Sequence, residues 1–428
     1  MEKLGGNQMK RIREKVSEGV YLNVINSDKF KTELISVYFI LPLNKQDVTF
    51  NTMIPLVLKR GTKDYNNSME IEKRLEELYG SDLSISVTKK GEKHVLRFSI
   101  EGPSENFVES NKIFNNKLDI LKSIIYEPLL INNVFKKDYV NQEKRNLKDR
   151  ISSKINDKQQ YAVQRTVEEM FRDEKYSIYK YGYIEDLDKI NEVNLYKHYL
   201  DLLKRARIEI NIVSNLESEQ IRKSIKDKFS YNEREEINLE REKVIFNEIK
   251  EKIIIDKMDV TQGKLTLGYR TNIPYEDKLY SAFLVGNYIL GGGPDSKLFL
   301  NVREKHSLAY YVYSRVYKYK SIMLISAGIE FDKFEDALKI IKEQIELMKQ
   351  GEFDQKSIEQ SKKAIITSMK TINDDIFSIS EFYLSKVLSN DDKNIEGLIE
   401  SIREVNKEDI IAAINKIKLD TVYFLKDK

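Results

Sequence analysis

An arginine and a tyrosine seven residues apart, Arg303 and Tyr310, stand out in this sequence as a pair that could take part in chemistry. A guanidinium and a phenol hydroxyl can both donate hydrogen bonds to a developing oxyanion. The pair follows three glycines, and the pattern predicts that Arg303 ends a short helix and that Tyr310 lies on a strand. Residue types alone favour a purely structural explanation, since arginine suits a helix C-terminus and tyrosine suits a strand.

The segment that contains both residues, LGGGPDSKLFLNVREKHSLAYYVYS, resembles the C-terminal-domain motif of the pitrilysin/insulinase family of zinc peptidases. The SKLF, VREK and LAY elements match this motif, as does the spacing of seven. In that family the arginine and the tyrosine reach into an active site built by a homologous domain. The resemblance implies this role for Arg303 and Tyr310, and makes Gly292, Gly293 and His306 candidates for substrate contact.

Active members of the family bind zinc through H-x-x-E-H, in which one helical turn places two imidazoles and a general-base carboxylate on one face. This sequence lacks the motif. The matching helix is FNTMIPLVLKRGT, in which the two histidine positions fall on Thr52 and Leu56 and the glutamate position on Pro55. Leucine has no donor atom, and proline inside a helix removes a backbone hydrogen bond, so the site is degenerate.

The third zinc ligand of the family is a glutamate on a later helix, seven residues after an acid that supports the site. The segment YVNQEKRNLKDRI resembles that helix, with Glu143 as the supporting acid and Arg150 at the ligand position. A cation repels a metal ion and has no lone pair to donate. The resemblance therefore implies that this chain binds no metal or other cofactor, and that Glu143 pairs with an arginine or a lysine instead.

The composition excludes several other kinds of site. The chain has no cysteine, which excludes disulfides, thiolate zinc sites and a cysteine nucleophile. Its 72 Lys and Arg residues against 69 Asp and Glu leave a net charge of +3, which implies no strong field for nucleic acid. No apolar run reaches the roughly 18 residues of a membrane span, and no signal peptide is recognisable. We therefore expect a cytoplasmic protein.

The two halves of the sequence repeat one pattern of elements. Strands expected at 35–41 and 264–270 are each followed by two helical segments and a strand pair. The strand pairs are expected at 82–89 with 93–101 and at 309–317 with 321–330, and the long helices after them at 105–125 and 332–350. Strand pairs mixed with helices favour an α+β fold with largely antiparallel sheets.

These repeats predict two homologous domains, each a mostly antiparallel sheet packed with helices, as in the pitrilysin-like metallopeptidases. The expected boundaries place the N-terminal domain, with the degenerate zinc site, at 1–225 and the C-terminal domain, with Arg303 and Tyr310, at 251–428. The charged segment 226–250 has few apolar residues, and we expect a solvated, partly helical linker there.

The resemblance implies a non-catalytic subunit of a heteromeric zinc peptidase. The expected partner is a homologous subunit with an intact H-x-x-E-H and bound zinc, whose site Arg303 and Tyr310 would complete for peptide hydrolysis. Hydrolase activity is then expected only in the complex. The alternative is a pseudo-peptidase, for instance a homodimer, that binds or scaffolds a peptide during the maturation or modification of another polypeptide, without hydrolysis. Neither a nucleic acid nor a membrane is an expected partner.

Overall fold

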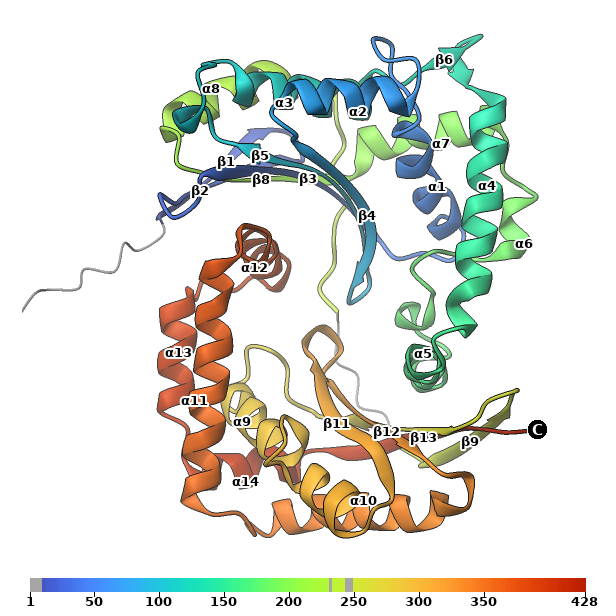
Figure 1. Ribbon diagram of the computed structural model, residues 1–428, viewed down its shortest axis with the longest axis vertical. Coiled ribbons are helices and arrows are strands. Elements are labelled where there is room, and N and C mark those ends of the chain that lie inside the picture. Colours follow the sequence, from blue (N-terminus) through green and yellow to red (C-terminus); the bar gives the residue numbers. More distant parts are fainter. Residues whose placement is uncertain (1–9, 231–232, 243–248) are drawn as a thin grey trace, which may run out of the picture. The chain divides into compact units, whose positions relative to one another are not determined.

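The strands predicted at 35–41 and 264–270 lie inside two separate sheets of the computed structural model, which describes residues 10–230, 233–242 and 249–428 (Figure 1). Each sheet belongs to its own unit. Unit 1 comprises Met1–Ser152, Ile178–Glu240 and Asp374–Ser385, and unit 2 comprises Ser153–Ser177, Arg241–Asn373 and Lys386–Lys428. The predicted α+β fold of two domains is confirmed. Among the described helices, none is both long and apolar enough to cross a bilayer.

The sheet of unit 1 has the strand order β1-β2-β8-β3-β5-β4, in which only β2 and β8 run parallel. Its strands are β1 (Lys10–Ser17), β2 (Val20–Asn26), β3 (Thr32–Pro42), β4 (Asp82–Lys90), β5 (Lys93–Pro103) and β8 (Arg207–Ser214). The main helices of the unit are α1 (Val48–Leu58), α2 (Ser68–Glu77), α3 (Ile113–Tyr126), α4 (Lys137–Ser152), α7 (Glu192–Arg205) and α8 (Ser218–Phe229). Their apolar residues form one core with alternate residues of β3, such as Val37 and Phe39.

The sheet of unit 2 has the strand order β11-β12-β10-β13-β9, in which only β13 and β9 run parallel. Its strands are β9 (Lys252–Lys257), β10 (Gly263–Arg270), β11 (Ala309–Tyr317), β12 (Ile322–Ile329) and β13 (Lys418–Lys426). Its helices include α9 (Tyr280–Gly291), α10 (Phe334–Lys349), α11 (Gln355–Thr371), α13 (Ile395–Arg403) and α14 (Lys407–Asn415). A second core fills the space between these helices and the sheet.

The two sheets share one topology, as the sequence repeats predict. The order β2-β8-β3-β5-β4 in unit 1 matches β9-β13-β10-β12-β11 in unit 2, with the parallel pair at the same place. Unit 1 adds β1 outside β2. Both predicted strand pairs form, but the helix predicted at 105–125 begins only at Ile113, because Glu105–Phe107 form a separate 3₁₀ turn.

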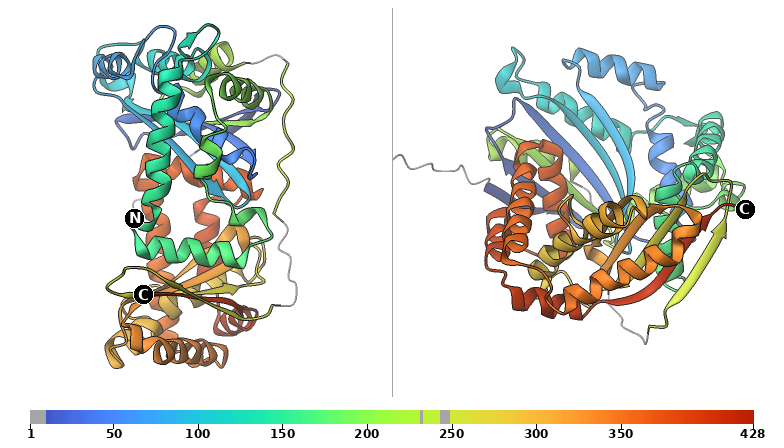
Figure 2. Two further views of the ribbon diagram at one scale, coloured as in Figure 1. Left: turned by 90° about the vertical axis from the view of Figure 1, so that its right-hand side faces the viewer. Right: turned by 60° about the horizontal axis from the view of Figure 1, so that its bottom comes forward.

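The units are not the contiguous halves that the sequence suggested, because α5 (Lys158–Met170) belongs to unit 2. This helix precedes the domain boundary predicted at residue 225, yet it crosses the sheet of unit 2 over β10 and β13 (Figure 2). Its Val163 and Val167 pack against Ile322 and Leu324 of β12. The face of the sheet that α5 covers is apolar, and covering it removes that surface from water.

The first part of α12 (Ile376–Ser389) lies in the C-terminal half of the sequence but belongs to unit 1, where it covers the sheet. Ile376 and Ile379 pack against Ile25 and Leu34. Ser380 adds polar contacts, since its hydroxyl lies 2.9 Å from the Tyr38 hydroxyl and its carbonyl accepts a 2.9 Å hydrogen bond from Asn211. The domain limits drawn from the sequence therefore differ from the structural units at both 153–177 and 374–385.

The charged segment 226–250 is only partly the solvated linker that we expected. Helix α8 continues through Phe229, and residues 235 and 237 then donate backbone hydrogen bonds to Lys204 and Arg205. Arg234 is buried and donates to the carbonyl oxygens of Glu18, Leu203 and Ala206. Arg234 and these backbone hydrogen bonds therefore fix this stretch to unit 1. Residues 231–232 and 243–248 lie outside the described residues.

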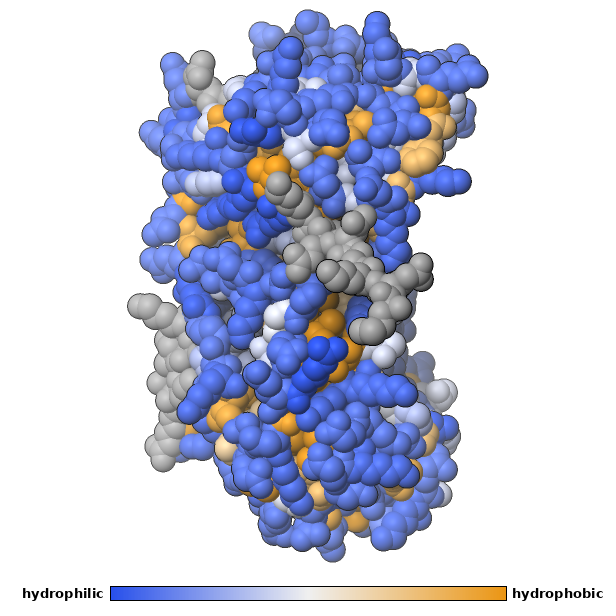
Figure 3. Space-filling view, turned by 90° about the vertical axis from the view of Figure 1, so that its left-hand side faces the viewer, coloured by the Kyte–Doolittle hydropathy of each residue, from blue (hydrophilic) through white to orange (hydrophobic). Residues whose placement is uncertain are grey.

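The visible surface in Figure 3 is mostly hydrophilic, with small and separated hydrophobic areas. This pattern matches the interspersed positive and negative residues of the sequence and its small net charge of +3.

Candidate functional site

The glycine-rich turn after α9 brings the chain close against one tyrosine ring. A Cβ atom on Gly292 would lie 2.6 Å from the Tyr288 ring, which is closer than real contacts allow. Gly293 lies beyond it, near the Tyr288 hydroxyl. Only glycine fits at Gly292, so packing alone accounts for that residue, and its contact with a substrate stays a prediction.

Arg303 lies on a seven-residue π-helix, Phe299–Lys305, where the sequence predicted a short helix. Such wide turns are rare and occur often at functional sites. The guanidinium lies 4.6 Å from the centre of the Phe299 ring and 3.7 Å from the Glu304 carboxylate. Its side chain is 43% exposed, so Arg303 is held in place by its own helix but remains accessible. His306, just after this helix, is also exposed.

Tyr310 lies at a β-bulge near the start of β11. Ala309 pairs with Ile329 and Tyr311 pairs with Gly328, so Tyr310 is the extra residue between them. A bulge re-aims one side chain and is common beside active sites. Tyr310 is 59% exposed, and its hydroxyl makes only a long 3.4 Å contact with Glu330. The π-helix and the bulge thus expose the side chains of Arg303 and Tyr310 on neighbouring elements of unit 2.

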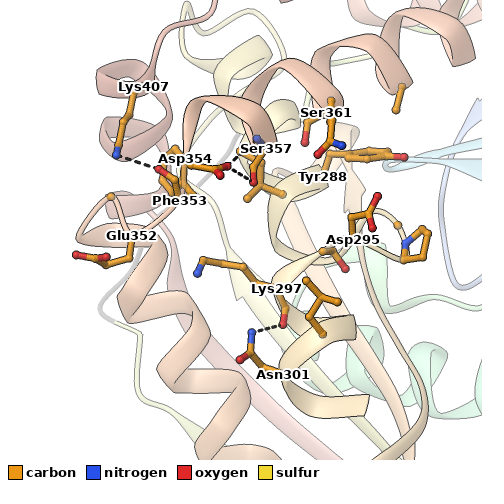
Figure 4. Close-up of a pocket in the computed structure, with 18 residues that line it drawn as sticks. Tyr288, Asp295, Lys297, Asn301, Glu352, Phe353, Asp354, Ser357, Ser361 and Lys407 are labelled. Carbon is orange, nitrogen blue, oxygen red and sulfur yellow. Dashed lines mark hydrogen bonds between the residues drawn. The ribbon is translucent and has the colours of Figure 1, made fainter. Parts of the chain in front are cut away.

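A cavity of about 730 Å³ lies behind the glycine-rich turn, between the π-helix and the start of α11 (Figure 4). Its polar lining includes Ser296, whose buried hydroxyl has no hydrogen-bond partner, and Lys297, whose pKa burial lowers. Asp354 accepts hydrogen bonds from the backbone and hydroxyl of Ser357, at 2.8 and 2.6 Å. Its described lining residues also include the carboxylates Asp295 and Glu352, but no histidine.

The degenerate zinc positions of α1 serve the core of unit 1. Thr52 is fully buried, and its hydroxyl donates to the carbonyl oxygens of Val48, at 2.9 Å, and Lys180, at 3.2 Å. Leu56 belongs to the hydrophobic core, and Pro55 lies inside the helix. None of the three offers a ligand to an ion.

The segment 178–183 fills the space beside these residues. The Lys180 carbonyl also contacts Nε2 of His94, at 2.9 Å, and the Tyr183 amide donates to Thr49 Oγ1, at 3.1 Å. Gly182 has φ +80°, and a Cβ atom there would lie 2.1 Å from Thr49 Oγ1. Burial lowers the pKa of His94 to about 4 and keeps the ring neutral. Sequence reasoning missed this closure because a backbone carbonyl leaves no trace in residue types.

The third ligand position also lacks a donor. Arg150 is exposed, and its guanidinium lies 5.4 Å from the centre of the Tyr181 ring. Glu143 is buried and forms an ion pair with Arg60, which confirms that it pairs with an arginine. In the described parts of the chain, no three His, Asp or Glu side chains are grouped so as to hold a metal ion. The residues at this site do not fit zinc.

Comparison with known proteins decides the family. Over 409 residues the chain is 37% identical to the "Probable inactive metalloprotease YmfF" of Bacillus subtilis strain 168, which covers 95% of this chain and 96% of that relative. The family description "Peptidase M16 inactive domain" matches residues 189–365. This chain belongs to the peptidase M16 family. It is a homologue of an inactive M16 metalloprotease, in agreement with the resemblance to the pitrilysin/insulinase peptidases.

Solved structures agree with this assignment. A conserved protein from Enterococcus faecalis V583 has a TM-score of 0.89 and 28% identity, and covers 98% of this chain and 99% of its own. A protease from Helicobacter pylori has a TM-score of 0.81 over 98% of this chain and 100% of its own, and its 15% identity makes this a likeness of fold alone. The M16 fold thus extends over nearly the whole chain.

Proposed function

We propose that this M16 chain is the non-catalytic subunit of a heteromeric zinc peptidase, in which it completes the active site of a zinc-binding homologue. The observation that carries the proposal is the contrast between the two motifs. The zinc positions on α1 are buried, with Thr52 bound to the Lys180 carbonyl and Leu56 in the core, whereas Arg303 and Tyr310 remain exposed on a π-helix and a β-bulge.

The proposed contribution of this chain to catalysis is electrostatic stabilisation of the transition state. In the partner, zinc would activate a water for attack on a peptide carbonyl, which produces a tetrahedral oxyanion. Arg303 and Tyr310 would donate hydrogen bonds to that oxyanion, and both have donors not committed to a buried partner. Any hydrolysis is then a property of the complex.

A relative named as a zinc protease and a relative named as a probable inactive metalloprotease occur in one organism. Bacillus subtilis strain 168 has the inactive relative YmfF and also a relative named "Uncharacterized zinc protease YmxG". The latter is 25% identical to this chain over 233 residues, which cover 53% of this chain and 55% of that relative. This co-occurrence supports a heteromer, and a cytoplasmic location remains part of the proposal.

The cavity behind the glycine-rich turn favours a second function, that of a pseudo-peptidase that binds a peptide without cutting it. The volume of about 730 Å³ is typical of ligand sites. Aromatic, charged and hydroxyl side chains line it, including Tyr288, Lys297 and Ser296. Such a protein would act as a peptide-binding scaffold, alone or as a homodimer.

A tagged pull-down from the native cells separates the two functions. The co-purifying protein is identified by mass spectrometry, and the complex is assayed for zinc and for hydrolysis of unfolded peptides. A partner of similar length with H-x-x-E-H, at one zinc per pair and with activity, supports the peptidase. Recovery of the chain without such a partner, and without activity, rejects the peptidase and leaves the peptide-binding function.

A further inference from the structure

The strand β9 of unit 2 has an edge that its counterpart in unit 1 does not have. In unit 1, β2 pairs with β8 on one side and with β1 on the other, and α8 packs over β1 and β2. In unit 2, β9 pairs with β13 and is the last strand of its sheet (Figure 1). Within the described residues, unit 2 has no equivalent of β1 or α8.

Two isoleucines are exposed on this edge strand. Ile253 is 51% exposed and Ile255 is 49% exposed. They lie in register with Val422 and Phe424 of β13, which are buried in the core, so they continue the apolar face of the sheet. At the equivalent place in unit 1, residues of β2 such as Leu22 are fully buried. An apolar edge strand of this kind is a template for pairing with another chain.

The sequence around β9 is complementary to itself in the antiparallel direction. When Glu251–Lys257 is placed against a second copy about Ile254, Ile253 lies opposite Ile255, Lys252 opposite Asp256 and Glu251 opposite Lys257. Directly opposed residues share a face of the sheet, so each pair joins either two apolar groups or two opposite charges. A register two residues away would instead place isoleucines opposite a lysine and an aspartate.

We propose that two copies of this chain associate through their β9 strands, which pair antiparallel about a two-fold axis at Ile254. The interface is isologous, so every favourable pair occurs twice, and the two five-stranded sheets become continuous. Glu251 accepts a 2.6 Å hydrogen bond from Lys342 but is 41% exposed, and Lys257 is exposed, so both charges can reach the second copy. Lys252 and Asp256 already bind the Glu169 carbonyl and the Arg165 guanidinium within unit 2, so the Glu251–Lys257 pairs carry the charge complementarity. Arg303 and Tyr310 take no part, and the pairing does not depend on the peptidase proposal.

The oligomeric state of the full chain, purified alone, tests this pairing by sedimentation velocity over a range of concentrations. The wild type is expected to form a dimer. Ile253→Lys places a charge opposite Ile255 of the second copy and is expected to raise the dissociation constant at least roughly ten-fold. Met69→Lys, at a 79% exposed apolar residue of α2, is the matched control and should leave the dimer unchanged.

A charge swap distinguishes pairing from misfolding. Glu251→Lys and Lys257→Glu each create two repulsive pairs in their own dimer, and each is expected to be mostly monomeric. Mixed in equal amounts, the two variants restore both attractive pairs and should dimerise again. A wild type that stays monomeric, or a dimer that Ile253→Lys and both charge variants leave intact, overturns the proposal.

Discussion

The carboxylate of Glu143 forms a buried ion pair with the guanidinium of Arg60, and this pair ties α4 to the residues that follow α1. The Glu143 side chain is 2% exposed and that of Arg60 is 21% exposed. By the family resemblance, the acid at this position supports a zinc site. Here the same acid has an arginine as its counterion, and this ion pair compensates for its burial.

Replacing Glu143 by alanine is expected to lower the free energy of unfolding by about 1–3 kcal/mol, because Arg60 would lose its partner in a mostly buried place. Chemical denaturation measures the change. The double variant Arg60→Met with Glu143→Leu should lose less unfolding free energy than the sum of the losses in the single variants Arg60→Met and Glu143→Leu. Glu77→Ala breaks the exposed Arg74–Glu77 pair and should change stability by less than about 0.5 kcal/mol. Equal losses at Glu77 and Glu143 would contradict the structural role of the buried pair.

Restoring the family ligands is not expected to restore zinc binding. The variant with Thr52→His, Pro55→Glu, Leu56→His and Arg150→Glu supplies every missing side chain. Thr52 is fully buried beside the Lys180 carbonyl, however, and Leu56 is part of the core. Larger polar groups there should destabilise unit 1 by roughly 1–3 kcal/mol per position. Elemental analysis after dialysis against zinc should find well under one ion per chain; one tightly bound ion in a stably folded variant would show that the site is still open.

Acid is expected to destabilise the chain through His94. Its folded-state pKa of about 4 lies below the ordinary value of 6.5, so between these values the unfolded chain binds more protons than the folded chain. The stability contributed by the neutral ring is complete above about pH 6.5 and falls as the pH drops towards 4. From about pH 7.5 to about pH 5 the expected loss is about 2 kcal/mol.

The variant His94→Gln isolates this effect, because glutamine can still donate to the Lys180 carbonyl but does not titrate. Urea denaturation at the two pH values should show a smaller acid loss for the variant than for the wild type. The remaining loss includes His198, whose pKa burial also lowers. If both proteins lose the same stability, the ring of His94 is not the acid-sensitive group.

The sequence predicted the elements of this fold better than their assignment to the two units. Apolar periodicity located the central strands of both sheets, such as those at 35–41 and 264–270, but not β1, β2 or β9. The repeat of the pattern predicted that the two domains would be alike. The same periodicity shows that α5 has an apolar face, but not which sheet that face covers. Arg234 illustrates another limit, since a charged residue in a charged segment gave no sign that backbone carbonyls would bury it.

At the candidate site, the residue types could be interpreted from the sequence, but the local backbone geometry could not be predicted from it. By the resemblance, Thr52, Leu56 and Arg150 stand at ligand positions and Pro55 at the general-base position, and their residue types alone predict a degenerate site. The π-helix that holds Arg303 was predicted only as a short helix, because no residue pattern in 299–305 distinguishes the wider turn from an ordinary one. The bulge at Tyr310 was missed because the segment was read as one regular strand, whereas the bulge interrupts the alternation and leaves Ala309 and Val312 both buried.

The central functional prediction concerns Arg303 and Tyr310 in the complex with a zinc-binding homologue. Arg303→Ala and Tyr310→Phe each remove a hydrogen-bond donor proposed to face the oxyanion, and the loss of one such donor typically costs about 10²–10³ in rate. Both side chains are exposed, so neither change is expected to disturb folding. Steady-state hydrolysis of a fluorogenic peptide should therefore show a large fall in kcat with little change in KM.

Lys305→Ala is the matched control, because Lys305 is an exposed cation on the same π-helix, two residues from Arg303. It should leave kcat within about two-fold, since it removes a positive charge but not a donor proposed to contact the substrate. Co-purification and the zinc content of the complex should be the same for all three variants. A specific loss of kcat at Arg303 and Tyr310 then reflects the transition state, because assembly and metal loading are unchanged. Unchanged turnover in both variants of an active complex would show that the zinc subunit stabilises the oxyanion alone.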